Sequence, residues 1–305
     1  MKFRTEVHID KPSFSIRPLE RMLFVGSCFA DNIGKRFQDE KFRAVVNPYG
    51  VMYNPVSILH TVRRFTDEFK VSLSHPSKTS VEAVPVLPPW GDKRGAFPVL
   101  PPWGDKRGAF AVFTLGTNHV YRLKETGEIV DNCRKRPQRL FQEEELSIDR
   151  CCEALSDAVD LLQEITSELR VIVTVSPIRY AKYGFHGSQL SKATLLLAAD
   201  KLCRERENCT YFPAYEIVND ELRDYRFYKE DMLHPSDQAV SYIWERFSET
   251  FFDKATFDFL EKWRPIKEAL GHKPFNPDGE EYKLFMQRTH EKMMKLKEEY
   301  PELEI

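Results

Sequence analysis

The sequence predicts a three-layer α/β/α fold built on a parallel sheet, followed by a helical C-terminal appendage. Strongly apolar segments alternate with amphipathic segments along most of the 305 residues, as expected when parallel strands are joined by helices on both faces of a sheet. Residues 171–175, Val-Ile-Val-Thr-Val, are apolar almost without interruption, which is typical of a central strand buried on both faces. We therefore expect a main domain at residues 1–254 and an appendage at residues 255–305.

The first strand is predicted at residues 22–25, and an amphipathic helix follows it. Phe29, Ile33 and Phe37 recur every four residues, which places them on one face of that helix. The intervening Gly-Ser-Cys at residues 26–28 then forms a strand-to-helix turn. Such a turn exposes its residues at the carboxyl end of a strand.

The later elements follow the same pattern. A strand at residues 111–115 runs into Gly-Thr-Asn, and the strand at residues 171–175 stops at Ser-Pro. Cys151 and Cys152 fall within an apolar helical pattern, so at least one of them should be a core residue. Further helices are predicted at residues 189–205, after Ser236 as an N-cap, and in the appendage, whose apolar stripe is Tyr282, Phe285, Met286, Met293 and Leu296.

The composition is that of an ordinary soluble protein. Hydrophobic residues make up 42%, charged residues 30%, and the formal net charge is -2, so there is no electrostatic footprint for nucleic acid or an anionic membrane. The chain has no apolar run of membrane-spanning length and no signal-peptide core at its start, which predicts a cytoplasmic protein without membrane insertion. Six cysteines form no metal-type pair, and we expect no disulfide, no metal and no cofactor.

One segment is anomalous, because residues 85–97 recur letter for letter as residues 98–110. Two copies are too few for a solenoid, and their prolines oppose both helix and central strand. Only the second copy runs directly into the strand at residues 111–115. We expect the first copy to be looped out without a role of its own, and a proline-rich partner motif is the alternative.

The turn at residues 26–28 offers two candidate nucleophiles. At a helix N-terminus, backbone N–H groups and the helix dipole favour developing negative charge. Ser27 would need a base, whereas Cys28 could exist partly as thiolate. Each has a structural alternative, because Ser27 is also suited to cap the helix and Cys28 to pack beneath the turn.

His234 is the strongest candidate for that base. Among the eight histidines it alone has a carboxylate three residues before it, Asp231, and a Pro-Ser immediately after it. Asp231 is close enough to orient one imidazole nitrogen while the other faces the nucleophile. The structural alternative is a histidine that merely closes a turn.

Several blocks of this chain together resemble a known family. They are Phe-Val-Gly-Ser-Cys-Phe-Ala at residues 24–30, Asn-Pro-Tyr-Gly-Val-Met-Tyr-Asn-Pro at 47–55, Thr-Leu-Gly-Thr-Asn at 114–118, Ser-Pro-Ile-Arg at 176–179, and the segment 211–247. Over roughly residues 20–250 the chain is similar to the GSCFA-domain proteins, which are in turn similar to the SGNH (GDSL) hydrolases. The resemblance implies an SGNH-hydrolase-like, flavodoxin-like sheet.

The SGNH pattern uses four blocks that contribute a serine, a glycine, an asparagine, and a histidine with its aspartate. Carried onto this chain, it implies Gly50 and Asn118 as oxyanion donors beside the nucleophile and His234. Its first block reads Gly-Asp-Ser, whereas this chain has Gly-Ser-Cys, so an ungapped match selects Cys28 and a one-residue shift selects Ser27. The serine is preferred, because a hydroxyl fits the family relationship and acyl-ester chemistry.

The surrounding residues refine this site. Asn118 follows a strand and a glycine, where its amide can donate to an oxyanion, although a lone loop asparagine commonly forms an Asx-turn. Gly50 sits in a turn that favours glycine on conformational grounds alone. Arg179 follows the central strand and is a candidate substrate contact, with an ion pair as the alternative.

The sequence therefore predicts a hydrolase acting on an ester bond of a small molecule or acylated carbohydrate. The alternatives are a non-catalytic binding module that keeps the crevice, and an acyltransferase that uses the same site with another acceptor.

Overall fold

A five-stranded parallel sheet forms the centre of the protein, as seen in a computed structural model that describes residues 4–74 and 109–304. The strand order is β2-β1-β3-β7-β8, and every neighbouring pair is parallel. The strands are β1 (Arg21–Gly26), β2 (Arg43–Val46), β3 (Ala109–Leu115), β7 (Leu169–Val175) and β8 (Cys209–Tyr211). Strand β3 begins inside the second copy of the duplicated segment, and the predicted loop of the first copy lies outside the described residues.

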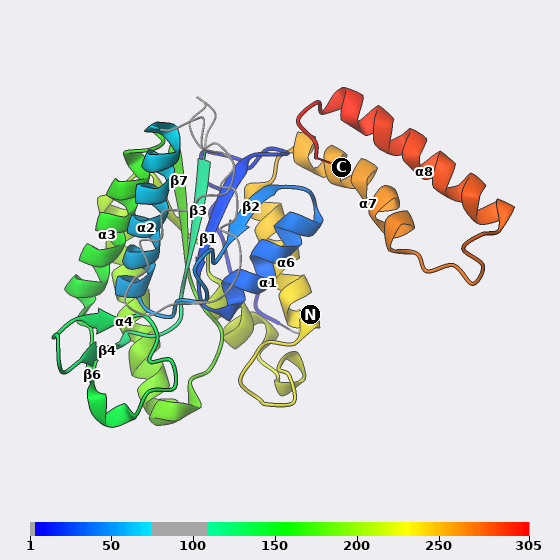
Figure 1. The fold of residues 1–305 in the computed structure, drawn as a ribbon. Coiled ribbons are helices and arrows are strands. Elements are labelled where there is room, and N and C mark those ends of the chain that lie inside the picture. The colour runs from blue at the N-terminus through cyan, green and yellow to red at the C-terminus, as the bar shows by residue number, and fades with distance from the viewer. Residues whose placement is uncertain (1–3, 75–108, 305) are drawn as a thin grey trace.

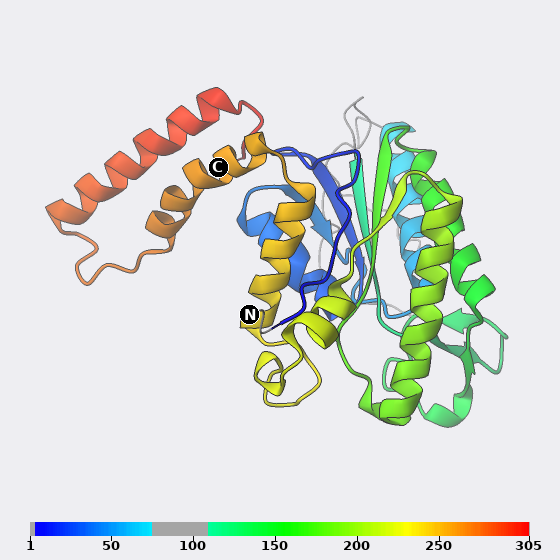
Figure 2. The same cartoon turned by 180° about the vertical axis from the view of Figure 1, so that it is seen from behind.

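Helices cover both faces of this sheet, which confirms the three-layer prediction (Figures 1 and 2). One face packs against α2 (Pro55–Ser74), α3 (Ile148–Gln163) and α4 (Gly184–Glu205). The other packs against α1 (Cys28–Asp39) and α6 (Asp237–Phe251). The core is strongly apolar on both faces, and Cys151 and Cys152 are both buried in it, as the helical pattern predicted.

A tight turn connects β1 to α1 and sets the position of the first candidate residues. Gly26 has φ +150°, and a Cβ atom there would lie 2.2 Å from the carbonyl oxygen of Thr114. Only glycine therefore lets the chain pass this close to β3. Ser27 follows as the N-cap of α1, and Ser236 caps α6 by accepting from the N–H of Ala239 at 3.2 Å, as predicted.

A small antiparallel sheet, which the sequence analysis did not predict, follows the carboxyl end of β3. Its order is β5-β4-β6, from β4 (His119–Leu123), β5 (Ile129–Val130) and β6 (Phe141–Glu145). The remaining short elements are the 3₁₀ helices η1 (Gln138–Leu140), η2 (Ala181–Tyr183) and η4 (Tyr225–Phe227), the helix α5 (Ala214–Glu216), and the π-helix η3 (Ile217–Leu222).

The C-terminal appendage is a hairpin of α7 (Lys254–Gly271) and α8 (Glu280–Glu299) that projects from the main body (Figure 1). It is joined there by the Trp263 indole, which donates to the carbonyl oxygen of Asp39 at 3.0 Å. Of the predicted apolar stripe on α8, Leu296 is buried and Met293 is partly buried, whereas Phe285 is exposed. Within the described ranges, no helix combines the length and apolar character that a membrane crossing requires.

Candidate active site

Ser27 is held inside the turn between β1 and α1. Its N–H donates to the carbonyl oxygen of Thr114 at 3.0 Å, and its hydroxyl accepts from the N–H of Phe29 at 3.3 Å. The residue is only 1% exposed. Ser27 therefore has the capping role that the sequence analysis gave as its structural alternative, and little of it is accessible to a substrate.

Cys28 is the first residue of α1 and is partly exposed. Its Sγ lies 3.5 Å from the hydroxyl oxygen of Tyr53. Burial, reinforced by the hydrogen bond to Cys28, raises the pKa of Tyr53 well above its ordinary value, so this hydroxyl stays protonated and able to donate. The thiol thus sits at a helix N-terminus beside a hydrogen-bond donor, which is a setting suited to a nucleophilic sulfur.

Asp231 and His234 form the predicted pair. The Asp231 Oδ2 atom lies 2.6 Å from Nδ1 of His234, and Oδ1 accepts the backbone N–H groups of Leu233 and His234, each at 2.9 Å. These three hydrogen bonds lower the pKa of Asp231 to about 2, so it is ionised at neutral pH. Because Nδ1 contacts the carboxylate, Nε2 of His234 is the ring nitrogen that a general base would use.

Arg179 fastens the loop that carries His234 to the segment after β7. Its backbone N–H donates to the carbonyl oxygen of Leu233 at 3.1 Å, and its Nη1 donates to that of Met232 at 2.9 Å. The guanidinium carbon lies 4.1 Å from the centre of the Phe185 ring, with Tyr225 and Tyr228 at 5.7 Å and 5.6 Å. Arg179 therefore has a structural function here, and its predicted contact with a substrate stays a prediction.

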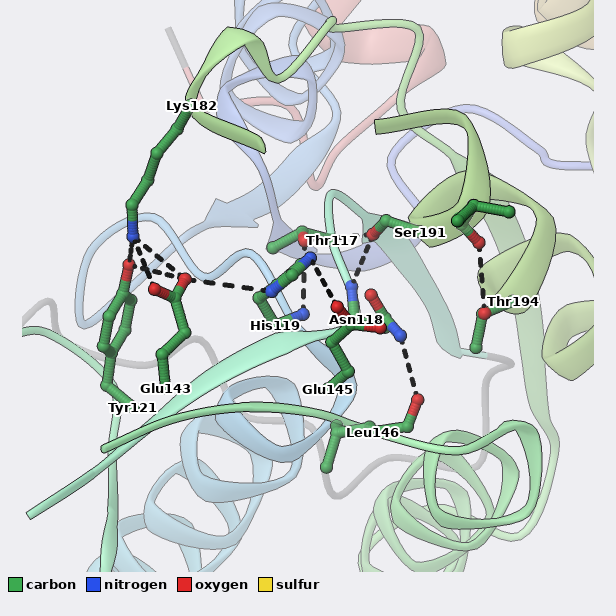
Figure 3. Close-up of polar contacts among 11 residues, drawn as sticks. Thr117, Asn118, His119, Tyr121, Glu143, Glu145, Leu146, Lys182, Ser191 and Thr194 are labelled. Atoms are coloured by element: carbon green, nitrogen blue, oxygen red, sulfur yellow. Dashed lines mark hydrogen bonds and ion pairs between the residues drawn. The ribbon is translucent and has the colours of Figure 1, made fainter. Parts of the chain in front are cut away.

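The two predicted oxyanion donors have partners within the protein. The Asn118 side-chain amide donates to the carbonyl oxygen of Leu146 at 2.9 Å (Figure 3). Gly50 has φ +98°, and its N–H donates to the carbonyl oxygen of Asn47 at 2.8 Å, which closes a turn. The hydroxyl of Tyr53, which no sequence pattern marked, is the polar group within hydrogen-bond distance of the Cys28 sulfur.

The loops that carry several of the predicted residues lie at one edge of the parallel sheet. Ser27 and Cys28 follow β1, the loop of Gly116 follows β3, and Arg179 follows β7. The backbone N–H groups of Gly116 and Thr117 both donate to the carbonyl oxygen of Tyr53 at 2.8 Å, while Arg179 binds the loop of His234. Ligands of open α/β sheets bind at this edge, beyond the carboxyl ends of the strands.

A second polar cluster lies on the antiparallel sheet (Figure 3). The His119 ring stacks on Tyr183 with centroids 3.6 Å apart, and lies 3.8 Å from Glu143 and 3.9 Å from Glu145. Burial lowers the pKa of His119, against the opposing effect of the two carboxylates. Lys182 binds Glu143 and the Tyr121 hydroxyl, so the cluster ties the antiparallel sheet to η2. Across residues 4–74 and 109–304, no group of three or more histidine, cysteine or acidic side chains could hold a metal ion.

Fold and site together define a three-layer α/β protein with a thiol, a tyrosine and an aspartate-histidine pair at the carboxyl edge of a parallel sheet. The GSCFA family model matches residues 21–79 and 106–247, and the model of the GSCFA domain protein C-terminal domain matches residues 263–305. The chain belongs to the GSCFA family.

A comparison with curated proteins finds no match. Among solved structures, the chain is similar to a Clostridium thermocellum family 3 carbohydrate esterase, with 10% sequence identity and a TM-score of 0.37. The match covers 79% of this chain and 98% of that one.

Proposed function

We propose that this protein hydrolyses an ester bond of a small molecule or acylated carbohydrate, through an acyl-enzyme on Cys28. The observation that carries the proposal is the Asp231–His234 pair at 2.6 Å, held by Arg179 at the sheet edge where Cys28 begins α1. Cys28 is preferred to Ser27 as nucleophile because the thiol is partly exposed, whereas Ser27 is buried and its hydroxyl caps the helix.

The chemistry proceeds in two halves. His234 accepts the thiol proton through Nε2, the sulfur attacks the ester carbonyl, and the tetrahedral intermediate expels the alkoxide, which takes the proton back from His234. Water then attacks the thioester with His234 as base, releasing the carboxylic acid and the thiol. Asp231 stabilises the imidazolium in both halves, and the Tyr53 hydroxyl donates to the sulfur and then to the oxyanion.

Hydrolysis of p-nitrophenyl acetate tests the proposal. Cys28→Ala and His234→Ala should each lower kcat by about a thousandfold or more, since loss of a member of such a set removes most of the rate. Ser27→Ala should keep turnover. His60→Ala is the matched control, because His60 on α2 makes a comparable pair with Asp131, whose carboxylate lies 2.9 Å from its ring nitrogen.

Equal turnover of wild type and His234→Ala would refute the assigned base. Turnover lost in Ser27→Ala and kept in Cys28→Ala would transfer the nucleophile to Ser27. If an added alcohol takes the acyl group in preference to water, the protein is an acyltransferase that uses the same residues.

A non-catalytic binding module is the second candidate, and one observation favours it. The amide of Asn118 and the N–H of Gly50, which an oxyanion hole of SGNH type would use, both donate to backbone carbonyl oxygens. A wild-type protein that binds an ester without any turnover, and whose Cys28 alkylates no faster than a simple thiol, would be such a module.

A further inference from the structure

Lys192 on α4 is a buried amine with no role in the chemistry proposed above. It is 2% exposed, and lysine is almost never buried this deeply unless it is paired with an anion. Burial alone lowers its pKa, to about 7, with no contribution from a charged group among the described residues. Because burying this amine costs free energy, its contacts show what its burial achieves.

Those contacts are two carbonyl oxygens at the ends of the central strands. The Nζ atom donates to Gly116, directly after β3, and to Ser176, directly after β7, each at 2.7 Å. A neutral amine has two N–H donors, so it satisfies both carbonyl oxygens without carrying a charge. Lys192 therefore joins the two strands at the edge where the candidate site lies.

Each carbonyl oxygen belongs to one half of the site. On the nucleophile side, Gly116 donates to the backbone of Tyr53, whose hydroxyl contacts Cys28. On the base side, the segment that starts at Ser176 continues to Arg179, which binds the loop of His234. Lys192 is thus one side chain that contacts both halves.

Neighbouring residues of α4 reinforce these contacts. The hydroxyl of Ser191 accepts the N–H of Asn118 at 3.0 Å (Figure 3), and that of Ser188 accepts the N–H of Tyr180 at 3.1 Å. Residues three and four apart share one face of a helix, so a single polar face of α4 binds both loops. The Tyr180 ring lies 5.8 Å from the Lys192 Nζ and 5.9 Å from the Tyr53 ring, between the two halves.

We propose that Lys192 is a positioning residue, which keeps the nucleophile half and the base half of the site in register by binding the Gly116 and Ser176 carbonyl oxygens together. Its effect on catalysis rests on the proposed function. The coupling of the two loops can be measured without any substrate.

Amide hydrogen exchange tests that coupling directly. In Lys192→Met, exchange should become about tenfold faster in both loops, residues 116–118 and 176–180, because each loses a hydrogen bond to the same amine. Lys201→Met is the matched control on α4, since its ammonium pairs with the exposed Asp149 at 2.6 Å, and both loops should keep wild-type exchange. Faster exchange in one loop only, or in α4 only, would overturn the coupling.

The wild-type protein provides a second measurement in case Lys192→Met does not fold. With lysine labelled with ¹³C at Cε, the Cε chemical shift reports the titration of Lys192 by NMR. The amide chemical shifts of both loops should change with the same midpoint. Among the described residues, the Tyr180 ring faces the amine, and burial raises the pKa of Tyr180 well above this range. Amide shifts that follow the lysine in only one loop, or in neither, would contradict the proposal.

Turnover then tests the catalytic consequence. In Lys192→Met, kcat for p-nitrophenyl acetate should fall about tenfold or more while KM changes less than about threefold, because alignment of the reacting groups is lost rather than substrate contact. An unchanged kcat would overturn the positioning role. A wild-type protein without turnover would overturn the proposed function instead, and hydrogen exchange would still decide the coupling.

Discussion

Because the amine of Lys192 is buried, the free energy of unfolding should depend on pH by an amount that can be calculated. Its pKa falls from the ordinary 10.5 to about 7 in the folded protein. Between these values the unfolded chain binds a proton that the folded chain does not, so this group makes stability rise with pH across that window. Below about pH 7 both states are protonated, and the full cost of burying the charge, about 5 kcal/mol, is present.

The variant Lys192→Met removes the titrating amine. We compare the free energy of unfolding of wild type with that of this variant at each pH, and take the difference, wild type minus variant. This difference should increase by about 1.4 kcal/mol per pH unit, hence by about 2 to 3 kcal/mol between pH 7 and pH 9. Hydrogen bonds lost to Gly116 and Ser176 shift the difference by a constant and leave the slope unchanged. Urea unfolding across this range measures it.

Lys201→Met is the control, because its exposed ammonium is held by Asp149, which raises the pKa of Lys201. The difference in free energy of unfolding between wild type and this variant should stay constant over the same pH range. A flat slope for Lys192→Met as well would mean that Lys192 stays protonated in the folded protein, and the reasoning from burial would be refuted.

Three further predictions follow from the same structure. Asp231→Asn should lower kcat for p-nitrophenyl acetate by about a hundredfold or more, because the His234 ring loses the partner that orients it; near-wild-type turnover would contradict that assignment. The pKa of Asp231 is lowered to about 2, so the ionised carboxylate should accept the amides of Leu233 and His234 above pH 4 and release them as pH falls through about 2. The amide chemical shifts of these two residues, followed by NMR against pH, measure the midpoint. A midpoint near the ordinary 3.8 would exclude the three hydrogen bonds. Gly26→Ala should destabilise the fold by about 3 kcal/mol or more in urea unfolding, since its Cβ would lie 2.2 Å from a backbone oxygen of β3, and a cost below about 1 kcal/mol would show that the turn can relax.

Local patterns in the sequence predicted the fold. The apolar run of β7 and the spacing of Phe29, Ile33 and Phe37 on α1 are signals carried by adjacent residues, and both elements form where expected. The antiparallel sheet was missed because β5 has two residues and β6 reads Phe-Gln-Glu-Glu-Glu, which has no alternating apolar pattern.

In the candidate site, contacts between residues close in the sequence were likewise predictable, and contacts between distant residues were not. Asp231 and His234 are three residues apart in one turn, so their contact is visible in the sequence. Tyr53 and Lys192 were missed because their contacts span 25 residues to Cys28 and 76 residues to Gly116, and no local pattern marks such pairs. The structural roles of Arg179 and Asn118 depend on distant backbone carbonyl oxygens in the same way.

The loop that carries His234 differs from the sheet in what holds it. Backbone and guanidinium hydrogen bonds from Arg179 fasten it, and the His234 and Asp231 side chains are 42% and 45% exposed, whereas the strands beneath are almost wholly buried. Segments with few buried apolar contacts open at a lower free energy than the core. On warming, this loop should detach while the sheet is still intact, so the hydrogen bonds from Arg179 would be lost well before the fold melts and would re-form on cooling.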